Sequence, residues 1–103
     1  MKAMYLSLLV AAGMLSAGVT QADEALAKAK NCFACHSVDK KIVGPAYKDV
    51  AAKYAGQRDA ETKLTEKIVR GGKGSWGEVP MPPNTTVKPE EARKLVKWIL
   101  SLK

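Results

Sequence analysis

The sequence has few soft metal ligands. Its 103 residues include one histidine and two cysteines, so a zinc finger with four Cys and His ligands would need a second chain. The length fits one small domain and leaves no room for a two-domain enzyme, a large parallel sheet or a repeat array. Internal repeats and low-complexity linkers are also lacking. These absences leave a single domain with a small supply of functional side chains.

Negative charge is the scarcer sign, with 10 Asp and Glu residues against 17 Lys and Arg residues and a formal net charge of +7. The cationic residues are scattered, and no run of five or six of them occurs. We therefore expect a solvated surface rather than a nucleic-acid binding site. With 26% charged and 47% apolar residues, the chain has enough apolar residues to fold.

The first 22 residues are typical of a cleaved secretory signal peptide. Lys2 precedes an apolar run from Ala3 to Leu15, and small and polar residues follow up to Ala22. The alternative is an uncleaved membrane anchor, but the apolar run is at the lower edge of the length that spans a bilayer. We expect cleavage after Ala22 and export to an oxidising compartment. The mature domain, residues 23–103, would be soluble, without a membrane anchor, and would carry a formal charge of +6.

Residues 32–36 form the motif C-x-x-C-H, which is the attachment motif of c-type haem. Two thiols three residues apart lie on one side of a helical turn, where each can add to one haem vinyl group. The next residue then falls beneath the iron, where an imidazole supplies an axial ligand. We therefore predict one haem c, joined through Cys32 and Cys35, with His36 as ligand. A domain this small is marginally stable alone, so the covalent cofactor would also stabilise its core.

Three other roles of the cysteine pair compete with haem attachment. A thioredoxin-like redox pair needs a strand before Cys32, and the sequence shows none. A structural disulfide that closes so short a loop would remove little entropy from the unfolded chain. A zinc site would lack two ligands. Free thiols in protein matured with a working haem-attachment system would favour the thiol oxidoreductase.

Met81 is the candidate for the second axial ligand. The other methionines, Met1, Met4 and Met14, lie in the predicted signal peptide. If a histidine and a methionine ligate the iron, the methionine is therefore Met81. Prolines flank Met81 on both sides and stiffen its segment, which does not suit an ordinary core position. The alternative is a haem protein with an open sixth site, such as a peroxidase or gas sensor, and no second histidine supports it.

Four segments have the helical spacing of apolar residues and no segment is a convincing strand, so we predict an all-α domain. The first helix runs from Glu24 to Lys30, with Leu26 and Ala29 facing inward. The other three have clear end signals: Gly44-Pro45 opens the second and Gly56 stops it, Asp59 caps the third and Gly71-Gly72 end it, and Pro89 starts the fourth. Tyr47 and Tyr54 are expected to be packing residues. Residues 71–87 are too rich in Gly and Pro for regular structure, and long loops of this kind are usually functional.

The chain resembles the small bacterial class I cytochromes c of the cytochrome c-551 type over essentially all of residues 23–103. Besides the C-x-x-C-H motif, the matching stretches are Val43–Ala51, Ser75–Gly77, Val79–Asn84 and Lys97–Leu102. The run Trp-Gly-x-x-Pro-Met-Pro-Pro-Asn, which ends at Asn84, is far more specific than the motif alone. The resemblance implies the small cytochrome c fold, with about four helices wrapped around one covalently attached haem.

The resemblance also implies roles for individual residues. His36 and Met81 would be the axial ligands, and the Pro45 carbonyl would accept a hydrogen bond from the His36 ring. Trp76 would donate its indole N–H to a haem propionate, and the Asn84 side chain would reach toward the Met81 sulfur. Simpler alternatives are that Trp76 only fills the core, that Pro45 only starts a helix and that Asn84 only caps a turn.

Lys67 falls where the family often has an arginine near a propionate, and a lysine there lacks the planar guanidinium. Members of the family shuttle single electrons in the periplasm between respiratory complexes and terminal reductases or oxidases. The resemblance thus implies a periplasmic electron carrier, not an enzyme, that works as a monomer. Its basic charge favours redox protein partners with acidic docking surfaces.

Overall fold

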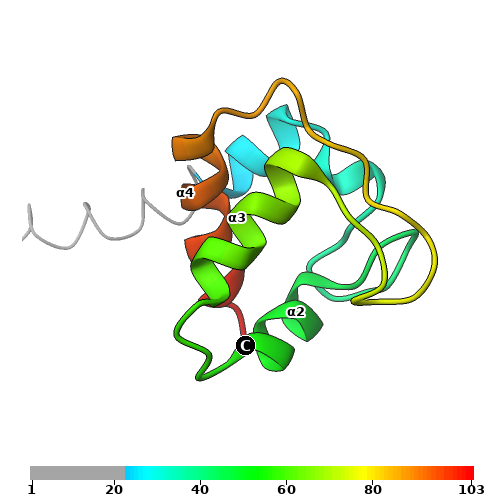
Figure 1. The fold of residues 1–103 in the computed structure, drawn as a ribbon, viewed down its shortest axis with the longest axis vertical. Coiled ribbons are helices and arrows are strands. Elements are labelled where there is room, and N and C mark those ends of the chain that lie inside the picture. Colours follow the sequence, from blue (N-terminus) through cyan, green and yellow to red (C-terminus); the bar gives the residue numbers. More distant parts are fainter. Residues whose placement is uncertain (1–22) are drawn as a thin grey trace, which may run out of the picture.

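The computed structural model describes residues 23–103, which form short helices joined by long loops (Figure 1). The predicted signal peptide, residues 1–22, lies outside the described residues. After helical residues 23–29 come the 3₁₀ turn η2 (Cys32–Ala34), α2 (Tyr47–Tyr54), α3 (Ala60–Arg70) and α4 (Pro89–Leu100). Within residues 23–103 the only extended pairings are two isolated backbone bridges, so the predicted all-α class is confirmed. No helix in this range is both long and apolar enough to cross a membrane.

Helix α4 provides the centre of the core. Its buried residues are Ala92, Leu95, Val96, Trp98 and Ile99, which recur at helical spacing along one face. Both α2 and α3 pack against α4, and the loop that follows α3, yellow in Figure 1, extends away from it. Burying one large aliphatic side chain contributes about 1.5–3 kcal/mol. Helix α4 is therefore the support to which the other two helices attach.

The buried face of the first helix differs from the prediction. Ala27 is fully buried and Leu26 half-buried, whereas Ala29, which the apolar pattern predicts to face inward, is exposed. Lys30 explains the difference, because its side chain is half-buried and its Nζ donates a hydrogen bond to the Thr86 carbonyl at 3.0 Å. A lysine can lay its apolar stem against the core and keep its charged end at the surface. A prediction from the spacing of apolar residues counts lysine as polar, so it misses this contact.

Two helix starts also differ from the prediction. Helix α2 begins at Tyr47, two residues after Pro45, because the Pro45 carbonyl faces the His36 ring. Asp59 precedes α3, but its side chain forms no capping hydrogen bond. Its carboxylate lies 3.0 Å from Lys63 one turn along the helix, and the hydrogen bond from Lys63 holds the pKa of Asp59 below its ordinary value. The ion pair takes the place of the predicted cap.

An aromatic cluster joins the C-x-x-C-H segment to the helices. The Phe33 ring centroid lies 6.1 Å from that of Tyr47 in α2 and 6.4 Å, edge to face, from that of Trp98 in α4. Tyr47 and Trp98 meet edge to face at 5.6 Å. Such pairs stabilise a fold beyond the area they bury. The cluster fixes the segment that carries the two cysteines to the helical core.

Candidate functional site

A cavity of about 290 Å³ lies between the C-x-x-C-H segment, the helices and the loop 71–87. Cys32, Cys35, His36 and Met81 all line it. The helices contribute apolar wall residues, among them Val50, Tyr54, Leu64, Ile68, Leu95 and Ile99. An apolar cavity with a few convergent polar groups is the usual form of a cofactor site. The structure thus brings the attachment motif and the candidate second ligand together across 45 residues of sequence.

The His36 ring is held by three neighbours. Its Nδ1 lies 2.8 Å from the Pro45 carbonyl oxygen, and because a carbonyl can only accept, Nδ1 carries the proton and Nε2 of the neutral ring keeps its lone pair. The Tyr47 ring stacks on the imidazole at 4.9 Å between centroids, with the planes 19° apart. The backbone at Gly44 passes so close that a Cβ there would lie 2.5 Å from the imidazole Cε1. His36 therefore has a fixed ring plane and one nitrogen available to a metal.

Backbone hydrogen bonds attach the C-x-x-C-H segment to the start of α2. The Cys35 carbonyl accepts from the Gly44 N–H at 2.7 Å, and the Ser37 carbonyl accepts from the Tyr47 N–H at 2.9 Å. The first N–H groups of a helix have no partner within the helix, so the second bond also satisfies the beginning of α2. The position of His36 is consequently tied to that of α2.

Met81 is fixed by its backbone. Its N–H donates to the Gly72 carbonyl at 2.7 Å, and its carbonyl accepts from the Gly72 N–H at 2.9 Å. Gly71, which ends α3, has a φ of 74°, and a Cβ there would collide with the backbone of Met81 and Pro83. The Gly71-Gly72 pair is therefore more than the helix stop that the sequence predicts. It allows the Met81 segment to lie directly against the end of α3.

Asn84 makes a different contact from the one that the resemblance implies. Its Nδ2 lies 2.9 Å from the Ile68 carbonyl oxygen, and its backbone N–H donates to the same oxygen at 3.1 Å. The Ile68 carbonyl is in the last turn of α3, where carbonyl groups lack partners within the helix. Asn84 thus attaches the chain just after Met81 to α3, and the side chain does not bond to the Met81 sulfur in this structure.

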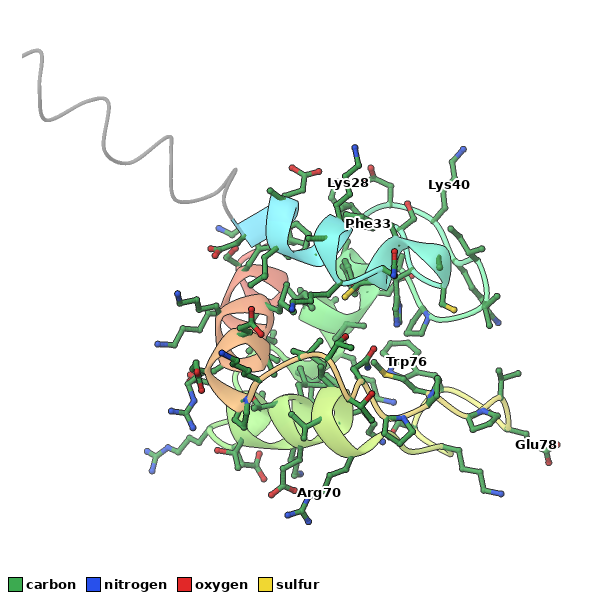
Figure 2. All side chains as sticks on the ribbon, turned by 90° about the horizontal axis from the view of Figure 1, so that it is seen from above. Lys28, Phe33, Lys40, Arg70, Trp76 and Glu78 are labelled. Carbon is green, nitrogen blue, oxygen red and sulfur yellow. The ribbon has the colours of Figure 1, made fainter. Side chains whose placement is uncertain are left out.

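Trp76 and Lys67 both line the cavity. Trp76 is 42% exposed, and Figure 2 shows it on the inner side of its loop, whereas Glu78 points away from the molecule. The ammonium of Lys53 lies 4.4 Å from the centroid of the Trp76 ring. The Lys67 Nζ lies 3.3 Å from Oγ of Ser75. The two residues that the resemblance places near a propionate therefore stand at the same cavity.

The structure also adds site residues that sequence reasoning does not find. The sequence predicts Tyr47 only as a packing residue, whereas its ring stacks on His36 and lines the cavity. The sequence predicts Gly44 only as part of a helix start and does not single out Lys53, because their contacts are with residues that the fold brings near. Gly44 does lie in Val43–Ala51, one of the segments that match the cytochrome c-551 type.

The alternatives to haem attachment find no support in the site. Burial raises the pKa of the Cys32 thiol, although a hydrogen bond from Tyr47 acts in the opposite direction, whereas a catalytic redox pair needs a cysteine of lowered pKa. Burial and the neighbouring Cys32 likewise raise the pKa of Tyr47. Among residues 23–103 there is no group of three His, Cys, Asp or Glu side chains placed to hold a zinc ion.

Comparison with known proteins decides the family, because residues 22–103 match the family model for cytochrome c. The chain belongs to the cytochrome c family. Cytochrome c-552 of Nitrosomonas europaea is 52% identical to this cytochrome over 103 residues, the full length of both proteins. Cytochrome c-551 of Pseudomonas aeruginosa is 54% identical over 99 residues, 95% of this chain and 94% of that protein. The crystal structure of wild-type N. europaea cytochrome c552 superposes with a TM-score of 0.75 at 55% identity, covering 78% of this chain and 99% of that chain.

Membership confirms the resemblance and the small all-α cytochrome c fold. The protein is an electron-transfer cytochrome with one covalently attached haem c, for which Cys32 and Cys35 have the required spacing. The residues fit that group, because both cysteines, an imidazole with a free Nε2 and a thioether line one largely apolar cavity. Its family implies redox partners.

Proposed function

We propose that this cytochrome is a periplasmic single-electron carrier in which His36 and Met81 are the two axial ligands. The observation that supports this most directly is that both residues line the cavity that contains Cys32 and Cys35. If His36 and Met81 both ligate the iron, no position would stay open for a substrate or O₂, so the protein would act as a carrier and not as an enzyme. When bound, the haem supplies a one-electron couple whose potential methionine ligation raises.

The surroundings of the two ligands suit rapid electron transfer. His36 keeps its ring plane through Pro45 and Tyr47, and Met81 keeps its place through Gly72. Ligands that are held in this way move little when the oxidation state changes, which keeps the reorganisation energy small. The apolar cavity wall disfavours additional charge, so it destabilises the oxidised state and raises the potential further.

Trp76 and Lys67 are proposed to bind the haem propionates. The indole N–H is a donor without acceptor capacity, and the lysine ammonium is a cation, so both suit a carboxylate. Their positions at the cavity support this assignment. Asn84 is proposed to act on the cofactor indirectly, by attaching the chain after Met81 to the end of α3.

The proposed docking face for redox partners surrounds the cavity. Val43 and Val79 are 52% and 66% exposed, and both line the cavity. Three lysines line it as well, Lys41, Lys67 and Lys73, against one acidic residue, Asp49. Apolar contacts with an excess of positive charge favour a partner with an acidic surface, which the charges would steer to this face. We propose that the protein acts as a monomer, in which the whole of this face is accessible to a partner.

Export is proposed on the sequence of residues 1–22. Fractionation of expressing cells should place a chain that begins at Asp23 in the periplasmic fraction, and mass spectrometry would give its first residue. A full-length chain that stays in the membrane fraction would instead support the uncleaved anchor.

The absorption spectrum of the purified protein, oxidised and reduced, with and without CO, tests the ligation. We expect sharp low-spin bands, a weak ferric sulfur-to-iron band that disappears in Met81→Ala, and no shift on addition of CO. A high-spin or CO-sensitive spectrum would mean an open iron and would support the peroxidase or gas-sensor alternative. The absence of haem bands from protein matured with a working attachment system would contradict haem attachment itself.

A further inference from the structure

Lys53, near the end of α2, contacts two successive residues of the loop that leads to Met81. Its Nζ donates a hydrogen bond to the Ser75 carbonyl at 2.6 Å and lies 4.4 Å from the centroid of the Trp76 ring. The first contact is a charge-assisted hydrogen bond and the second a cation–π interaction. One ammonium group thus joins α2 to the inner side of residues 73–80, which we refer to as the 73–80 loop.

The 73–80 loop has few other attachments to the helices. Its ends are joined by the pairing of Gly72 with Met81, and inside it the Gly74 N–H donates to the Gly77 carbonyl at 2.9 Å. Among residues 23–103, only two hydrogen bonds connect this loop to a helix, and these are the bond from Lys53 and the longer one, 3.3 Å, from Lys67 to Ser75. Gly74 and Gly77 have φ values of 98° and 111°, so the backbone on both sides of Trp76 depends on glycine.

Lys53 does not line the cavity, whereas Ser75, Trp76 and Met81 do. Lys53 therefore has no direct contact with the cofactor site, and its two contacts near that site are both with the loop. Trp76 occupies the inner side of the loop in Figure 2, so a loop that moves away from α2 takes Trp76 out of the cavity wall and loosens the segment that ends at Met81.

We propose that Lys53 is a positioning residue that keeps the 73–80 loop closed against α2 and thereby keeps Met81 in place as axial ligand. This inference rests on the proposed His36 and Met81 ligation. Lys53 would thereby help to keep external ligands away from the iron. Because Lys53 lies outside the cavity, it would do so by holding the loop.

The test is the binding of imidazole to the ferric holoprotein. Binding is measured as the loss of the sulfur-to-iron absorption band. Lys53→Met keeps an apolar side chain of similar length and removes the ammonium. We expect Lys53→Met to bind imidazole about five- to tenfold more tightly, as a higher apparent association constant. This corresponds to the loss of one exposed cation–π contact and one hydrogen bond. Lys53→Arg keeps both kinds of contact and should bind imidazole as the wild type does.

Lys48→Met is the matched control. Lys48 is on the same helix, lies outside the cavity and pairs with Asp39 at 2.6 Å, so the variant loses the same charge without touching the loop. Amide hydrogen exchange gives a second readout, because the Met81 N–H that bonds to Gly72 should exchange faster in Lys53→Met than in Lys48→Met. Urea unfolding midpoints of the two variants should agree, which separates loop opening from global destabilisation.

The outcomes separate the role of Lys53 from the ligation by Met81. If Lys53→Met and Lys48→Met bind imidazole within twofold of each other, or if Lys53→Arg is affected as strongly as Lys53→Met, the role of Lys53 is wrong while the ligation of Met81 stands. If the ferric spectrum of Met81→Ala equals that of the wild type, the ligation itself is wrong, and the role of Lys53 is overturned with it.

Discussion

At the scale of single residues, the plane of the His36 ring depends on the absence of a side chain at Gly44. The Pro45 carbonyl fixes Nδ1 and the Tyr47 ring covers one face of the imidazole. The remaining approach is taken by the backbone of Gly44, where a Cβ would meet Cε1, Nδ1 and Nε2 of the ring at 2.5–3.0 Å. Contacts this close are not found for real Cβ atoms, so a larger residue would force the ring or the chain to move.

Gly44→Ala should therefore lower the free energy of unfolding of the holoprotein by about 1–3 kcal/mol, which is the usual cost of overpacking, and should change the midpoint potential. Urea unfolding and potentiometry measure the two effects. Ala52→Val is the control, since it adds side-chain volume at an exposed position of α2 that does not line the cavity. Equal losses in the two variants would contradict the steric explanation.

The sequence predicts the site residues whose chemistry is local. Cys32, Cys35 and His36 follow from their spacing, and Met81 follows because residues 23–103 contain no other methionine. Lys53 could not be predicted, because its partners depend on how α2 faces a loop 22 residues further along the chain. The same holds for the Asn84 side chain, whose acceptor is determined by where α3 ends.

At the scale of elements, the segment around Met81 is attached to α3 at two places. Gly72 pairs with Met81 just after the helix, and Asn84 donates twice to the Ile68 carbonyl in its last turn. The helix ends themselves follow from sequence signals, since Gly71 ends α3 and Pro89 begins α4 as predicted. The geometry of the segment between α3 and α4 does not follow from sequence signals. It depends on which carbonyl groups at the end of α3 have no partner within the helix.

Asn84→Ala should lower the free energy of unfolding by about 1 kcal/mol, because one hydrogen bond to the Ile68 carbonyl is lost while the backbone bond remains. The ferric sulfur-to-iron band should keep its position. Urea unfolding and the ferric spectrum are the measurements, with Thr85→Ala at the exposed neighbouring position as control. A shifted band with unchanged stability would show that Asn84 acts on the Met81 sulfur instead.

Helix α4 begins with a carboxylate that should make its stability depend on pH. Glu91 accepts a hydrogen bond from the Lys88 N–H at 3.0 Å, and this bond, assisted by the charge of Lys30, holds the pKa of Glu91 below its ordinary value of 4.5. A carboxyl group whose pKa is lower in the folded protein stabilises the fold above its ordinary pKa. The stabilisation is lost as the pH falls through the lowered pKa.

Glu91→Gln should accordingly be less stable than the wild type at pH 7, because glutamine keeps an acceptor but loses the charge. The difference should disappear in acid, once Glu91 is protonated in the wild type. Urea unfolding of both proteins from neutral pH to about pH 3 measures it. Glu90→Gln removes the same charge from the same helical turn and serves as control. A difference from the wild type that stays constant with pH would rule out this explanation.

At the scale of the whole molecule, positive charge gathers where the cavity meets the surface. Lys41, Lys67 and Lys73 line the cavity, and Asp49 is the one acidic residue among its lining residues. Arg70 in α3 points away from Trp76 in Figure 2 and does not line the cavity. The sequence predicts the net charge but not its distribution, because the lysines lie scattered along the chain and only the fold brings these three together.

The oxidation of the ferrous protein by ferricyanide, an anion, should slow about tenfold between low and high salt, whereas oxidation by a cationic complex that is a strong enough oxidant, such as tris(phenanthroline)cobalt(III), should not slow. At low salt, Lys73→Glu should slow the reaction with ferricyanide about threefold more than Arg70→Glu, which changes the net charge equally. Stopped-flow absorption at the haem bands measures both rates. Equal effects of the two variants would show that only net charge matters.

The backbone pairing of Gly72 with Met81 makes the position of the ligand independent of side chains at the outer tip of the loop that it closes. Main-chain hydrogen bonds do not depend on side-chain identity, so the side chain at Glu78, which points away from the molecule (Figure 2), can change during evolution while Met81 stays where it is. Lineages of this cytochrome should therefore differ in loop length and surface charge at this tip. The spacing from Cys32 to His36, which attachment dictates, leaves no such freedom.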